Sequence, residues 1–161
     1  MRVWMRIPDA MIRKRGNDML NYWWVTRPKR KLNSVPEVLA AFADLSLNQE
    51  WDGQRDSHLA YEDALEAAGL KRKGERRDQT GGGARTYKAW LASLGLIFTQ
   101  ESTGKIKLTL AGEAIMNGDS TVDVLTNQIL KYQFPSSFSL GRGVQVAERF
   151  KIRPFRFLLK L

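Results

Sequence analysis

The side chains of this chain with the clearest chemical potential are cations gathered around one short segment. The run KRKGERRDQTGGG occupies residues 71–83, and Arg85 and Lys88 follow it. Guanidinium and ammonium groups bind phosphate oxygens through charge-assisted hydrogen bonds, and a glycine-rich helix start can offer backbone N–H groups to the same anion. The pattern therefore favours the binding of a polyanion.

Positive charge is concentrated in two stretches. The 161 residues carry a formal charge of +9, with a pI near 10.0. Nine cations against two Asp give residues 1–31 a net +7, and seven cations against one Glu and one Asp give residues 71–88 a net +5. Cations near a phosphate backbone release condensed counterions on binding. We expect the two stretches to form one surface for nucleic acid.

Several other chemistries are excluded by composition. The chain has no Cys and a single His, which removes disulfides, thiol chemistry and Cys/His zinc sites. We expect no metal site in these residues. No apolar run approaches the roughly 20 residues that span a bilayer. The expectation is a soluble protein of the bacterial or archaeal cytoplasm with no membrane partner.

The cations need elements to position them, and a helix over about residues 84–94 comes first. Its apolar residues recur at i, i+3, i+4 and i+7, and Gly95 ends it. The opposite side carries Arg85 and Lys88 with two small residues, Ala89 and Ala92, between them, which favours close approach to a groove. The three glycines before this helix read as a flexible lead-in or as a mobile linker.

A hairpin follows this helix and is expected to pair 96–100 with 105–110 around Gly104. Its second strand alternates, so Lys105 and Lys107 share the solvent face. Beyond it we expect Thr109 to cap a short helix, a capping box at Ser120 and Asp123 to open another that runs to about Gln133, and Pro154 to open a last one. The stretch 135–149 reads as an irregular loop.

Two helices and a strand are expected upstream. Ser34 and Glu37 form a capping-box signature for one helix, and Ser57 is expected to cap a second that ends at Gly69. On the second helix the acidic residues Glu62, Asp63 and Glu66 are expected to face outward. His58 is placed near the start of that helix, and residues 22–26 read as a short strand.

Together these elements predict a mainly α fold with a small β component, of the α+β class. A winged helix-turn-helix lobe is flanked by further helices and a short N-terminal strand or arm. The expected division is 1–56 for the basic arm and first helix, 57–118 for the winged-helix lobe, and 119–161 for C-terminal helices.

The expected partner is double-stranded DNA, because a winged helix places one helix in the major groove and its hairpin on the neighbouring backbone. Base readers are expected on that helix, namely Arg85, Thr86 and Lys88. Phosphate contacts are expected from Lys71, Arg72, Lys73, Arg76, Arg77, Lys105 and Lys107. A second DNA surface is expected at Arg27, Lys29, Arg30 and Lys31.

Three blocks of this sequence resemble the AlwI-like type IIS restriction endonucleases and their nicking relatives. They are TYKAWLASLGLIF with KIKLTLAGEAIMNGD, then LTNQILKYQFPSS, then FKIRPFRFLLKL. The order and spacing are similar over roughly residues 20–161. The resemblance implies an N-terminal recognition region of an enzyme that binds an asymmetric site and cuts nearby with a separate C-terminal nuclease domain, which uses Mg²⁺ held by carboxylates.

The cutting site itself is not expected within these residues. In this chain no Asp or Glu is followed two residues later by Lys, so the (D/E)xK half of such a nuclease site is absent, and one His cannot form an HNH site. We therefore expect no catalytic residue here. The short apolar helix PFRFLLKL at the C-terminus suggests a cut piece of a longer protein, which we expect to be a monomer.

Two other functions stay open. The first is a complete small winged-helix regulator, which would dimerise on a two-fold symmetric operator. The second is a winged-helix module for protein interaction, since the fold alone does not define the ligand. The strong positive charge favours DNA over the second alternative.

Overall fold

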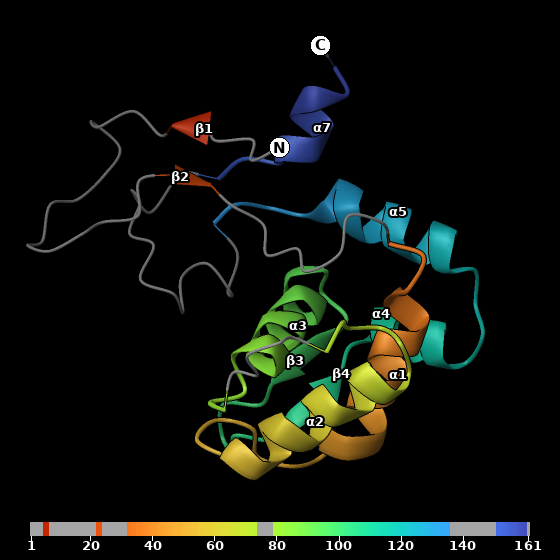
Figure 1. The fold of residues 1–161 in the computed structure, drawn as a ribbon. Coiled ribbons are helices and arrows are strands. Elements are labelled where there is room, and N and C mark those ends of the chain that lie inside the picture. Colours follow the sequence, from red (N-terminus) through yellow and green to blue (C-terminus); the bar gives the residue numbers. More distant parts are fainter. Residues whose placement is uncertain (1–4, 7–21, 24–31, 74–78, 136–150, 161) are drawn as a thin grey trace, which may run out of the picture. The chain divides into compact units, whose positions relative to one another are not determined.

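The computed structural model describes residues 5–6, 22–23, 32–73, 79–135 and 151–160 (Figure 1). These residues are mainly helical with two short antiparallel strand pairs, which confirms the α+β class. Two compact units are formed, one by residues 26–125 and the other by residues 1–25 with 126–161. Among the described ranges, no helix is long and apolar enough to cross a membrane.

The unit of residues 26–125 is built on helices packed around one apolar core. Its elements are α1 Val35–Ser46, α2 Arg55–Ala67, α3 Gly82–Ser93, β3 Ile97–Thr99, β4 Ile106–Leu108 and α4 Leu110–Met116. Phe42 of α1, Tyr61 of α2 and Trp90 of α3 all lie in this core and are almost fully buried. Burial of each such side chain stabilises the fold by about 1.5–3 kcal/mol, so the core holds the three helices together.

The helix starts differ from expectation at two places. Ser34 precedes α1, but its hydroxyl makes no cap hydrogen bond and is buried without a partner in the described residues, so the capping box does not form. The second helix begins at Arg55, two residues before the expected cap at Ser57. The cap at Thr109 is confirmed, since its Oγ1 accepts from the Gly112 amide at 3.1 Å.

The hairpin forms as expected, and a third segment of the chain is hydrogen-bonded to its second strand. Phe98 pairs with Lys107 in an antiparallel register, and Gly104 lies in the turn at φ +67°. The segment 47–50, read in the sequence as a plain connection, lies beside β4. The Asn48 amide donates to the Ile106 carbonyl at 2.9 Å, and the Ile106 amide donates to the Gln49 carbonyl at 3.0 Å. The residues between α1 and α2 are thereby joined to the hairpin.

The remaining elements are short, and one of them, α5 (Thr121–Lys131), begins in the unit of residues 26–125 and ends in the other. Strand β1, Met5–Arg6, pairs antiparallel with β2, Tyr22–Trp23. Helix α5 begins after Ser120, whose Oγ accepts from the Asp123 amide at 3.4 Å as expected, and it ends two residues before the expected Gln133. Helix α7, Pro154–Leu158, opens at its proline. The loop expected at 135–149 lies outside the described residues apart from Pro135.

Candidate nucleic-acid interface

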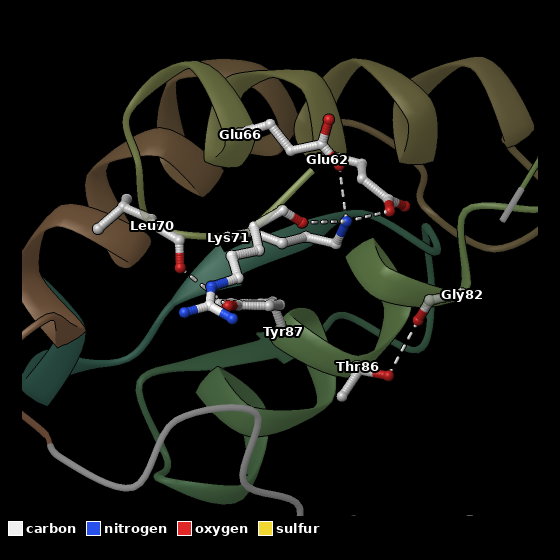
Figure 2. A network of polar contacts seen from close by, with 8 residues as sticks. Glu62, Glu66, Leu70, Lys71, Gly82, Thr86 and Tyr87 are labelled. Atoms are coloured by element: carbon white, nitrogen blue, oxygen red, sulfur yellow. Dashed lines mark hydrogen bonds and ion pairs between the residues drawn. The ribbon is translucent and has the colours of Figure 1, made fainter. Parts of the chain in front are cut away.

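The exposed part of α3 is its N-terminal half. Arg85 and Thr86 are exposed, whereas Lys88 is half-buried and its Nζ lies 3.4 Å from Thr99 Oγ1 on β3. Thr86 donates its hydroxyl proton to the Gly82 carbonyl at 2.9 Å (Figure 2). The expectation that Ala89 faces a groove is wrong, because only 5% of it is exposed. The face that a ligand can reach is therefore shorter than the sequence predicts.

The three glycines at the start of α3 allow its backbone to pack closely against α2. Gly81 caps α3 in the left-handed region at φ +71°, and a Cβ built there would lie 2.5 Å from the Cβ of His58. A Cβ on Gly83 would lie 2.7 Å from the Glu62 carboxylate. Gly82 and Gly83 already belong to the helix, so the reading of this run as a flexible linker is wrong. The glycines let the start of α3 sit directly against α2.

Lys71 is held by two carboxylates of α2. Its Nζ lies 2.7 Å from Glu62 Oε1 and 2.7 Å from Glu66 Oε1 (Figure 2). Glu62 is only 1% exposed, so the expectation that it faces outward is wrong. Burial by itself lowers the pKa of Lys71, but the hydrogen bonds and charges of Glu62 and Glu66 raise it, and the net pKa lies above the ordinary value. This ammonium is committed to α2, which disfavours a phosphate contact.

The start of the basic segment is also anchored to α3. The Tyr87 hydroxyl donates to the Leu70 carbonyl at 3.0 Å (Figure 2). Burial raises the pKa of Tyr87, while the charge of Lys71 acts in the opposite direction, so the phenol stays a donor at neutral pH. Arg72 and Lys73 follow with exposed side chains. Arg76 and Arg77 lie outside the described residues.

The outer face of the hairpin combines cations with an aromatic ring. Lys105 is exposed, and Lys107 Nζ donates to Asn48 Oδ1 at 2.6 Å. Phe98, opposite Lys107, is 47% exposed and was not singled out from the sequence. The signal for it was present, because three successive apolar residues, Leu96 to Phe98, cannot all face one side of a strand.

A second cluster of cations joins Arg85 to Arg55, which the sequence analysis did not single out. Arg55, in the first turn of α2, donates from Nε to the Gln79 carbonyl at 2.9 Å. Arg85 donates to the Thr80 carbonyl and, at 3.2 Å, to Thr80 Oγ1. Both arginines line one open hollow of about 490 Å³. A cation in the first turn of a helix opposes the helix dipole, and this could have drawn notice to Arg55.

One expected surface lies outside the described residues. The proposed second surface of Arg27, Lys29, Arg30 and Lys31 falls in residues that the structure does not describe. Across the described part of the chain, no group of three or more His, Cys, Asp or Glu side chains is arranged to hold a metal ion.

The comparisons with known proteins add no family to this geometry. No protein-family model matches the chain, and no curated protein matches it significantly. The likeness to the AlwI-like enzymes thus stays a sequence-based expectation.

Proposed function

We propose that residues 32–125 form a winged helix-turn-helix lobe that binds double-stranded DNA sequence-specifically. The observation that carries the proposal is the segment 47–50 beside β4. It places a segment bridged to the hairpin between α1 and α2, which gives the order helix, bridged segment, two helices, hairpin, similar to the order of winged-helix domains. In such domains the helix before the hairpin docks in the major groove.

The side chains of α3 and the hairpin support this docking. The Thr86 hydroxyl already donates its hydrogen bond to the Gly82 carbonyl, so its oxygen is left to accept one, which suits the amino group of cytosine or adenine. Lys88 is the second candidate at base edges. Arg72, Lys73, Lys105 and Lys107 are the phosphate candidates, and each phosphate neutralised adds about 0.9 to the slope of log K against log salt.

The wider setting that we propose is a type IIS restriction or nicking enzyme of the AlwI-like kind, for which this lobe recognises the site. Its support is the order of the three sequence blocks and the lack of a (D/E)xK pattern in the 161 residues. Cleavage and Mg²⁺ binding would then belong to a nuclease domain outside this sequence.

Selection of bound duplexes from a random pool tests the proposal, followed by anisotropy titrations at several salt concentrations. We expect one asymmetric site to be enriched and bound by a monomer. Thr86→Ala should weaken the selected site more than random duplex, by about 1–3 kcal/mol, while Arg72→Ala should weaken both alike. Enrichment of a palindrome bound by a dimer would favour the small regulator. Binding that is absent or insensitive to salt would contradict DNA recognition.

A further inference from the structure

The hollow that Arg55 and Arg85 share lies where the beginnings of α2 and α3 meet. Its volume is about 490 Å³, and it is open to solvent on one side. The lining residues are Gly53, Arg55, His58, Gln79, Thr80 and Arg85. No carboxylate belongs to this lining, although Asp52 and Asp56 flank it in the sequence.

Both guanidinium groups are held in place and still have donors to spare. Arg55 uses Nε on the Gln79 carbonyl, and Arg85 uses two nitrogens on Thr80. A guanidinium has five N–H donors, so each arginine keeps at least three. Within the described residues, neither arginine forms an ion pair with a carboxylate. Two positive groups thus line one hollow, each held by hydrogen bonds and neither paired with a carboxylate of the described residues.

The floor of the hollow is a buried histidine. His58 is 5% exposed, its ring lies 4.4 Å from that of Trp51, and its Nε2 lies 2.9 Å from the Trp51 carbonyl. A carbonyl can only accept, so Nε2 carries a proton, and Nδ1 has no hydrogen-bond partner among the described residues. Gly81 packs against the Cβ of this histidine. The hollow is therefore a built feature with a polar floor.

The hollow carries positive charge that no carboxylate of its lining balances. The two arginines repel one another, and the positive ends of α2 and α3 add to the same potential. An anion in the hollow would offset both effects. Forked guanidinium donors from two directions suit a tetrahedral phosphate, and the open side leaves room for the groups esterified to it.

We infer that this hollow binds one phosphate of the DNA backbone, gripped by Arg55 and Arg85 together. The inference rests on the proposed function, and it assigns Arg85 to the backbone instead of to the base edge expected from the sequence. Contact at this point would fix the register of α3 along the groove.

The test asks whether the two arginines together contact one phosphate or two. On random 20-base-pair duplex, the salt slope counts phosphates neutralised, at about 0.9 each. The double variant Arg55→Gln/Arg85→Gln should lower the slope by about 0.9, and neither single variant should lower it further than that. The matched pair Arg72→Gln/Lys105→Gln, which removes two separate contacts, should lower it by about 1.8. Lys151→Gln, an exposed cation of the other unit, is the charge control.

The outcomes separate the two claims. A wild-type protein that does not bind duplex defeats the proposed function and this inference with it. If the wild type binds duplex normally, two results overturn the inference alone. In the first, the salt slope of Arg55→Gln/Arg85→Gln equals that of Lys151→Gln. In the second, the slope of the double variant falls by about 1.8. A parallel titration with inorganic phosphate, followed through the NMR resonances of the Arg Nε–H groups, tests whether the hollow binds a free anion instead of a DNA phosphate. Saturation by free phosphate that leaves duplex binding unchanged would show a site for a free anion and would also overturn it.

Discussion

Replacing Lys71 by Met should destabilise the fold strongly. Lys71 is the sole cation paired with Glu62 among the described residues, and Glu62 Oε2 is already buried there without a hydrogen-bond partner. Removal of the ammonium leaves the carboxylate uncompensated, which costs about 3–5 kcal/mol for a buried pair. Since small domains are stable by about 5–15 kcal/mol in total, the loss should be a large part of it.

Urea denaturation of the purified variants measures this effect directly. The control is Lys73→Met, an exposed neighbour whose loss should change the free energy of unfolding by less than about 0.5 kcal/mol. The triple variant Glu62→Leu/Glu66→Leu/Lys71→Met should recover most of the stability, because buried ion pairs can be replaced by apolar groups at little cost. Equal unfolding free energies for Lys71→Met and Lys73→Met would refute the reasoning and return Lys71 to the phosphate candidates.

Two further predictions concern packing and pH. Gly81→Ala should cost about 1–3 kcal/mol more than Gly69→Ala in urea denaturation, because both have φ near +70° but a Cβ meets His58 at Gly81 alone of the two; equal costs would contradict close packing. Burial, then Tyr87, raises the pKa of Tyr61, so its stabilisation is complete below the unfolded value near 10 and declines as pH rises above it. Tyr61→Phe should reduce the decline between pH 10 and 11 by up to about 1.4 kcal/mol per pH unit, and an unchanged slope would refute this.

The parts of the fold that local patterns determine were predictable. The spacing of Tyr87, Trp90 and Leu91 predicted the buried side of α3, and all three are buried. Gly104 predicted the hairpin turn, and Thr109 predicted a cap that forms. Each of these features depends on residues within one or two turns of the chain, so a sequence window contains the whole cause.

The parts that depend on distant residues were not predictable. Glu62 has the sequence neighbours of a surface residue, and it is buried because Lys71 returns beyond the Gly69 turn to pair with it. Arg55 and Arg85 line one hollow because α2 and α3 pack at their starts through Gly81 and its contact with His58. Periodicity does not encode such encounters.

The hydrogen bonds between segment 47–50 and β4 have a consequence for the thermodynamics of association. They brace the hairpin against the chain that follows α1, and Lys107 adds its own bond to Asn48. If the hairpin is the wing that we propose, it would meet DNA with most of its conformational freedom already lost during folding. Ordering a side chain at an interface costs about 0.5–1.5 kcal/mol, and the hydrogen bond to Asn48 already orders Lys107 in part in the free protein.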